Sequence, residues 1–165
     1  MRALLVGLWL IGTLGTARAD SFVWRTTVMN LPGGTGATAQ FTGLSGTFAS
    51  TTAIGTNNTD AAYVVVRPII IWRMDCAEDV THGGAFNRVY TLQSCATSGC
   101  TPANLSPSVT CTTVNSCAVP TCNCSTTLAN GSLVGAGSRM VLKIAGSSNS
   151  LNASNATCEV TYTYQ

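Results

Sequence analysis

The most apolar stretch after residue 19 reads Tyr63-Val64-Val65-Val66-Arg67-Pro68-Ile69-Ile70-Ile71-Trp72. Its β-branched residues continue without polar alternation, which predicts a strand buried on both faces or one that crosses between two sheets. Pro68 has no amide hydrogen to donate to a sheet, so we expect the strand to break there. Because an exposed strand of this composition would aggregate, we expect the stretch to form the core of a β domain.

The rest of the chain shares this β character. Short alternating or β-branched segments recur between clusters of Gly, Asn and Ser, whereas helical spacing of apolar residues is not sustained and good helix formers are sparse. The expected strands are 21–30, 37–42, 46–52, 61–67, 69–74, 88–93, 108–113, 139–145 and 157–164. This pattern predicts an all-β protein: a single antiparallel β-sandwich or jelly-roll-like domain, stapled by disulfides, with an extended N-terminal strand.

The N-terminus resembles an export signal. A basic start is followed by an apolar run over residues 3–14, which is too short to span a bilayer because a spanning helix needs about 20 residues. Ala17 and Ala19 are small residues at alternating positions, as a signal peptidase requires. We therefore expect a secreted, extracellular protein with a cleaved signal peptide (1–19), an N-terminal strand and Gly/Pro tether (20–36), and a β-sandwich domain (37–165) with a cysteine-rich insertion around 95–124.

Charge is scarce and balanced. The formal net charge of +2 comes from Arg2 and Arg18, and without them six basic side chains (8 − 2) face six acidic ones. A neutral chain offers no basic surface for nucleic acid or an anionic membrane. Charged residues make up 8% of the chain, where about 25% is usual. Such a surface favours association between copies or needs glycans to solvate it.

The cysteines indicate an oxidising compartment. An even number in an exported chain of this size predicts four disulfides, with roughly a hundred pairings open. Most fall between Cys95 and Cys124, which predicts a stapled, irregular excursion there. Metal ligation by thiolates is disfavoured, because the chain has one histidine and the Cys122–Cys124 spacing is shorter than zinc sites use. The eight residues are Cys76, Cys95, Cys100, Cys111, Cys117, Cys122, Cys124 and Cys158.

Asn-x-Ser/Thr sequons are abundant and indicate that N-linked glycans are possible partners of the chain. Asn104 is followed by Pro107 directly after its serine, and Asn123 lies between two cysteines. The others fall in Gly/Ser/Asn-rich stretches that we expect to be exposed loops. In a protein from a eukaryote we expect several of these asparagines to carry glycans, whereas in a bacterial protein we expect the sequons to be unmodified. The candidates are Asn57, Asn104, Asn123, Asn130, Asn152 and Asn155.

An aromatic segment follows the expected cleavage site. In an extended strand, one face would carry Phe22, Trp24, Thr26 and Val28. The sequence Leu31-Pro32-Gly33-Gly34 comes next and forms a loose tether. Such a strand can pair within its own domain, or it can complete the sheet of a neighbouring copy.

The C-terminal segment alternates in the same way. One face of a strand would carry Cys158, Val160, Tyr162 and Tyr164, and the other Glu159, Thr161 and Thr163. With the aromatic N-terminal strand, the low charge and the export signal, this layout resembles pilin-type fibre subunits. The resemblance covers the general layout and no specific motif. It implies homopolymers joined head to tail, in which the N-terminal strand of one copy fills the sandwich of the next.

Catalytic equipment is not expected. The one cluster of ionisable groups, from Asp75 to His82, could hold a divalent cation or act in acid–base chemistry, but a polar turn explains it better. The sequence contains no nucleophile elbow, no phosphate-binding glycine loop and no second histidine. We expect no enzyme, cofactor or metal site, and a structural subunit of an extracellular fibre or surface appendage. The alternative is a secreted lectin- or adhesin-like module, which would need an exposed aromatic platform, yet Trp24 and Trp72 lie in core-like strands.

Overall fold

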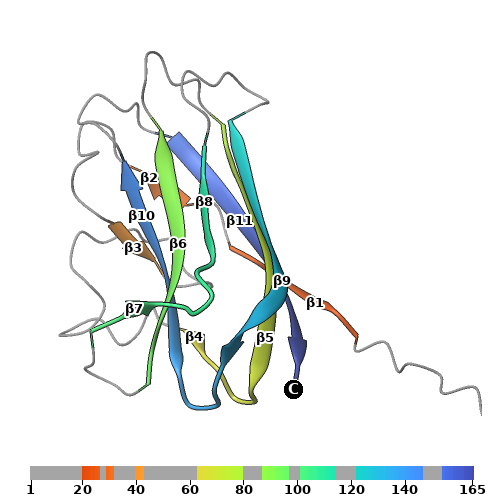
Figure 1. The fold of residues 1–165 in the computed structure, drawn as a ribbon. Coiled ribbons are helices and arrows are strands. Elements are labelled where there is room, and N and C mark those ends of the chain that lie inside the picture. Colours follow the sequence, from red (N-terminus) through yellow and green to blue (C-terminus); the bar gives the residue numbers. More distant parts are fainter. Residues whose placement is uncertain are drawn as a thin grey trace, which may run out of the picture.

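The structure, a computed structural model, describes residues 20–26, 29–31, 40–42, 63–79, 87–96, 101–113, 122–146 and 154–165. These residues form eleven β-strands in two antiparallel sheets that pack face to face (Figure 1). The described ranges contain no helix, and hence none that could cross a membrane. The predicted antiparallel β-sandwich stapled by disulfides is confirmed.

The first sheet, sheet A, carries the N-terminal strand at its edge. Its strand order is β1 (Phe22–Arg25), β11 (Ser154–Tyr164), β5 (Ile69–Glu78) and β9 (Asn123–Val134), with β2 (Met29–Leu31) also paired to β11. β1 and β2 both run antiparallel to β11, β1 beside its C-terminal half and β2 beside its start. β1 and β2 therefore both lie along the same edge of β11.

The second sheet, sheet B, covers the other side of the core. Its strand order is β3 (Gln40–Thr42), β10 (Arg139–Gly146), β6 (Arg88–Cys95) and β7 (Ala103–Asn104), and β4 (Tyr63–Val64) pairs with β10 while β8 (Thr110–Thr112) pairs with β6. The β6–β10 ladder is the longest in this sheet, extending from Arg139–Cys95 to Gly146–Arg88.

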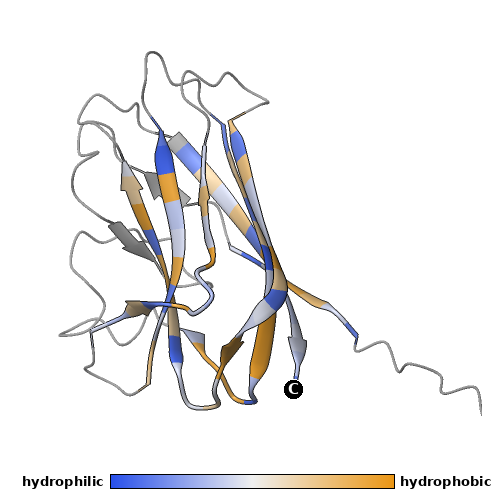
Figure 2. Ribbon diagram, viewed as in Figure 1, coloured by the Kyte–Doolittle hydropathy of each residue, from blue (hydrophilic) through white to orange (hydrophobic). Residues whose placement is uncertain are grey.

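The core lies between the sheets and is built around the apolar stretch. β5 alternates strictly at first, so Ile69 and Ile71 point inward, and Met74 and Cys76 continue the buried face after an irregularity. Figure 2 shows the apolar residues of β5, β6 and β10 along their strands. The buried residues that form the main cluster include Tyr90, Leu92, Val109, Met140, Leu142, Ile144, Val160 and Tyr162.

The strand break at Pro68 is as expected, although the preceding strand is shorter than predicted. Residues 61–67 were expected to form one strand, but β4 covers Tyr63–Val64 and a bend follows at Val66 and Arg67. The bend turns Val65 into the core, 1% exposed, and leaves Val66 80% exposed. A backbone that must change direction before Pro68 cannot continue as a regular strand.

A bulge interrupts the β5–β9 ladder. Ile71 faces Ser132 and Arg73 faces Thr127, so Trp72 sits opposite four residues of β9 where a regular ladder would place one. Gly131, with φ of +64°, lies against Ile70 and Trp72: a Cβ there would collide with Ile70 Cγ2 and lie 3.2 Å from the Trp72 ring. The Trp72 indole donates to Thr163 Oγ1 at 3.0 Å, which fixes the ring against β11.

Two other sequence expectations differ from the structure. The expected strand 21–30 is divided into β1 and β2, and the expected irregular insertion around 95–124 contributes β7, β8 and the start of β9. No strand was predicted over 123–134, because its Asn, Ser, Ala and Gly residues have low β propensity. Pairing with β5 along most of its length overrides that preference. The expected strand 46–52 lies outside the described residues.

Candidate functional site

The N-terminal strand docks on its own chain. Phe22 pairs with Tyr162 and Arg25 with Glu159 at the two ends of the β1–β11 ladder. Thr26 is buried and fixes the end of this ladder: its amide donates to Cys158 O, and its hydroxyl accepts from Cys158 N, both at 2.8 Å. Within this chain, the strand therefore completes its own sheet.

The inward face of β1 enters a group of tyrosines, as its alternation predicted for Phe22, Trp24 and Thr26. Val28, the fourth residue of the proposed assembly strand, lies outside the described residues. The Trp24 ring centroid lies 4.1 Å from that of Tyr162 and 4.3 Å from that of Tyr63. The Phe22 centroid lies 5.6 Å from Tyr162 and 5.0 Å from Tyr164. We name this five-ring cluster the aromatic seat; its residues are Phe22, Trp24, Tyr63, Tyr162 and Tyr164.

The aromatic seat joins the two sheets. Tyr63 comes from β4 of sheet B, whereas the other four rings come from sheet A. The alternation of Tyr162 and Tyr164 in the sequence showed that they share a face, but nothing local indicated that Tyr63 would meet them. Phe22 and Tyr164 remain 40% and 42% exposed, so the seat is open on one side.

Two phenols of the seat, Tyr63 and Tyr162, have raised pKa values and stay neutral well above physiological pH. Burial, together with the hydrogen bond to Tyr164, raises the pKa of Tyr162 to about 12. Burial also raises the pKa of Tyr63, and the nearby Tyr164 adds to the effect. Neutral phenols can pack against Trp24 without the cost of burying a charge.

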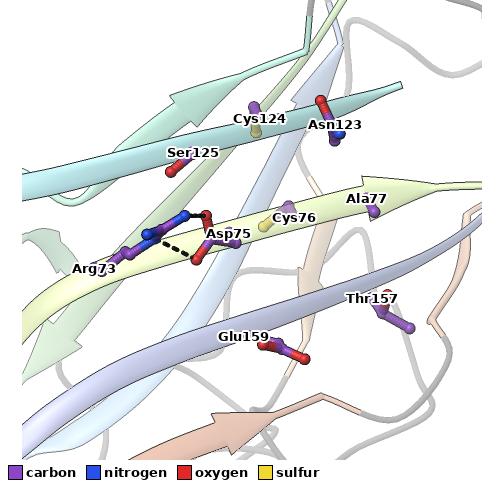
Figure 3. A pocket seen from close by; sticks show the side chains of 9 residues that line it. All are labelled: Arg73, Asp75, Cys76, Ala77, Asn123, Cys124, Ser125, Thr157 and Glu159. Carbon is purple, nitrogen blue, oxygen red and sulfur yellow. Dashed lines mark hydrogen bonds and ion pairs between the residues drawn. The ribbon is translucent and has the colours of Figure 1, made fainter. Parts of the chain in front are cut away.

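A second feature lies on the outward face of sheet A. A hollow of about 360 Å³ lies over β5, between β9 and β11. Figure 3 shows the side chains that line it. We name it the outer hollow. Its floor is Ala77, which pairs with Thr157 on one side and Asn123 on the other. Its other polar lining residues are Arg73, Asp75, Ser125 and Glu159.

The charges at the outer hollow are paired. Arg73 donates to both carboxylate oxygens of Asp75, at 2.7 and 2.8 Å, and Arg25 Nε donates to Glu159 at 2.6 Å. Burial alone would raise the pKa of Asp75, but hydrogen bonds from Arg73 and Ser125 outweigh it and hold that pKa below its usual value. Glu159 and Asp75 are register neighbours, so two ion pairs lie side by side across three strands.

The described ionisable residues between Asp75 and His82, which are close in the sequence, do not come together in the structure. Their side chains point in different directions along and after β5. Asp75 points outward and pairs with Arg73, whereas Glu78 points into the core. Asp79 accepts from the amide and the side-chain nitrogen of Asn155, both at 2.7 Å, and these bonds lower its pKa. His82 lies outside the described residues. The described acids of this cluster therefore form no common site.

Glu78 belongs to a buried network that ties the sheets together. Arg88 Nη1 donates to Glu78 Oε2 at 3.2 Å, and the Tyr90 hydroxyl donates to Glu78 Oε1 at 2.8 Å. The ionic side chains are 0% and 4% exposed. Burial, followed by the charge of Glu78, raises the pKa of Tyr90 well above its usual value. A buried salt bridge and a hydrogen bond thus connect β5 of sheet A to β6 of sheet B.

The disulfides follow the strand order. Cys76–Cys158 joins β5 to β11, and Cys111–Cys124 joins β8 of sheet B to β9 of sheet A. Cys95 and Cys122 are also disulfide-bonded, and Cys100 and Cys117 lie outside the described residues. The sulfurs of Cys76, Cys111 and Cys124 lie within 4.8 Å of one another, but a metal would need them as thiolates and here they are oxidised.

The four described sequon asparagines lie on strands, and for two of them, Asn130 and Asn155, exposed loops were expected. Asn123 and Asn130 are exposed on β9, Asn104 is exposed on β7, and Asn155 is half-buried on β11. Asn57 and Asn152 lie outside the described residues.

Neither a protein-family model nor a curated protein sequence matches the chain. Because one fold hosts many functions, the function must be argued from the aromatic seat and the outer hollow themselves.

Proposed function

We propose that this protein is an exported structural subunit of an extracellular fibre or surface appendage. Copies would join head to tail when the N-terminal strand of one fills the aromatic seat of the next, as pilin-type subunits do. The observation that carries the proposal is the position of β1: it is an edge strand, held to the body by its pairing with β11, by the Arg25–Glu159 ion pair and by aromatic packing. An identical element exchanged between copies makes the same contacts in both states.

The arrangement of cysteines supports this exchange. All eight lie at or after residue 76, so β1 can leave without breaking a disulfide. The receiving surface is stapled, because Cys76–Cys158 holds β11 on β5 and Cys111–Cys124 holds sheet A on sheet B. A body that keeps its shape while its edge is empty is a suitable acceptor.

The chain between β1 and β3 is long enough. Residues 26–39, fourteen in all (39 − 26 + 1), can extend to about 46–50 Å. The 11 residues of β11 span about 36 Å. If β2 is released, β1 can therefore reach the far end of a neighbouring body.

Cross-linking tests the proposal directly. Val23 pairs with Thr161 in the β1–β11 ladder. Protein carrying Val23→Cys is unfolded and refolded, to permit exchange, together with protein carrying Thr161→Cys. We expect a disulfide-linked heterodimer on a non-reducing gel, and filaments of the unmodified protein by electron microscopy. Heterodimers form because β1 of one copy lies on β11 of the other.

Two controls define the outcome. Val23→Cys refolded alone reports background pairing with native cysteines. Thr127→Cys lies in the same row of sheet A but on β9, two strands beyond Thr161, so it should give no product with Val23→Cys. If the Val23/Thr161 mixture gives no heterodimer and the protein stays monomeric at all concentrations, the fibre proposal is wrong.

A second function is favoured by the outer hollow: a secreted binding module for glycans or a receptor. Paired carboxylate and guanidinium groups beside Asn123, Ser125 and Thr157 offer both donors and acceptors to a polar ligand. A glycan array separates the two functions. Binding that is lost in a variant with Asp75→Asn and Glu159→Gln would favour the binding module.

A further inference from the structure

The outer hollow has the shape of a shallow trough with a small floor. Asn123, Ala77 and Thr157 form one row across β9, β5 and β11. Neighbouring strands lie about 4.8 Å apart, so the walls of the trough are about 10 Å apart. The exposed methyl group of Ala77 leaves the space above it open, and a planar or ring-shaped ligand can lie there.

The chemistry of the walls favours a neutral, hydroxyl-rich ligand. Asp75 and Glu159 already face Arg73 and Arg25, so the four charges at the hollow cancel. A simple anion or cation would have to compete with an existing ion pair. Sugar hydroxyls can instead donate to the free lone pairs of the carboxylates and accept from the Thr157 hydroxyl. The small apolar floor suits the C–H face of a sugar ring.

One wall residue is itself a glycan acceptor. Asn123 heads the sequon Asn123-Cys124-Ser125, and its exposed side chain lines the hollow. Asn155 is less suitable because its side-chain nitrogen is bonded to Asp79. A sugar attached to Asn123 would be held next to the trough, at a high effective concentration.

We infer that the outer hollow is the cradle of an N-linked glycan on Asn123, whose first N-acetylglucosamine units lie over Ala77 between β9 and β11. The inference does not require strand exchange, because none of the residues that line the outer hollow belongs to β1. After an exchange, the Arg25 that pairs with Glu159 would come from the neighbouring copy. Such a glycan would cover the charged centre of sheet A and solvate an otherwise charge-poor surface.

The test uses the full chain secreted from a eukaryotic culture. Glycopeptide mass spectrometry measures occupancy, and a peptide N-glycosidase is then applied to the native protein over time. We expect release from Asn123 to be about tenfold slower than from an unprotected site, since the sugar must first leave the trough. Asn130, exposed on the same strand, is the internal reference. Ala77→Leu fills the floor and should bring the Asn123 rate up to the unprotected value.

Three results would overturn the inference. The first is that Asn123 carries no glycan. The second is that its glycan is released at the same rate from the wild-type protein and from Ala77→Leu. The third is that wild-type protein without a glycan on Asn123 binds free N,N′-diacetylchitobiose in the hollow, which would assign the site to an external sugar. Because residue 77 is exposed, Ala77→Leu should keep the wild-type melting temperature, and this checks that the variant is folded.

Discussion

The indole of Trp24 packs edge-on against the phenol ring of Tyr63, their centroids 4.3 Å apart, although the two residues belong to different sheets. This contact closes the sandwich where β1 ends sheet A and β4 borders sheet B. Through this contact the N-terminal strand is part of the core. Any exchange of the strand between copies must therefore break the contact between Trp24 and Tyr63.

Trp24→Ala should therefore undock β1. Trp24 is half-buried, so we expect a loss of about 2–3 kcal/mol in the free energy of unfolding, below the 3–5 kcal/mol typical of a fully buried tryptophan. Urea unfolding measures this loss. Val23→Ala on the opposite, exposed face should change stability by less than about 0.5 kcal/mol. Equal effects of the two substitutions would show that the aromatic seat does not hold the strand.

Alkaline pH should loosen the same contact. The pKa of Tyr162 is raised to about 12 in the folded protein, so folding favours the neutral phenol. Its contribution to stability is fully present below pH 10, the ordinary tyrosine pKa, and is lost as pH rises toward 12. Unfolding free energies at pH 8, 9, 10 and 11 should fall only in the upper part of this range. Tyr162→Phe should show a weaker decline, and an unchanged decline would exclude this tyrosine as its source.

The Glu78–Arg88 pair should be costly to break singly. Arg88→Met leaves the Glu78 carboxylate buried without this ionic partner, and we expect a loss of about 3–5 kcal/mol. The double variant Glu78→Leu/Arg88→Met should recover much of that loss, because no buried charge remains. Denaturant unfolding of the variants completes a double-mutant cycle. Additive losses would contradict a direct coupling between the two side chains.

Gly131 and Gly137 provide a matched pair of substitutions. Both have positive φ, +64° and +81°, so alanine is strained at each. At Gly131 the new methyl group would also collide with Ile70 and lie 3.2 Å from the Trp72 ring, whereas at Gly137 nothing lies within 4 Å. We expect a loss of about 1 kcal/mol for Gly137→Ala and at least about 2 kcal/mol for Gly131→Ala. Equal melting temperatures for the two variants would contradict the close packing of Gly131 on Ile70 and Trp72.

The row of cysteines across sheet A predicts which new disulfide can form when their native partners are removed. Cys158, Cys76 and Cys124 are register neighbours on β11, β5 and β9. With Cys111→Ser and Cys158→Ser combined, the remaining Cys76 and Cys124 have sulfurs already within 4.8 Å and should form a new disulfide, which peptide mapping detects. Cys76→Ser with Cys111→Ser should leave two free thiols, because Cys124 and Cys158 are two strands apart, about 10 Å, beyond disulfide reach. A bridge in that control would contradict the strand order.

Local sequence was a good guide to which side chains share a face. The alternation identified Cys158, Val160 and Tyr162 as buried residues of β11, because successive side chains of a strand point to opposite faces. It failed at the end of β11, where the register shifts between Thr161 and Tyr162, Thr163 is buried and Tyr164 is 42% exposed. The apolar stretch around Pro68 located the core and the break in it. Local sequence failed for β9, whose composition is poor in β-branched residues and whose pairing with β5 is decided at long range.

The sequence by itself determined the β architecture, the oxidised cysteines of the described strands and the aromatic face of the N-terminal strand, since these follow from side-chain periodicity and redox chemistry. The tertiary structure alone decided that Tyr63 meets Trp24, that Cys76 bonds Cys158, and that Asp75, Glu78 and Asp79 separate to different partners. The reason is physical: periodicity fixes the direction of a side chain relative to its own strand, whereas its partner depends on which strands are neighbours, and that is set by the packing of the whole sandwich.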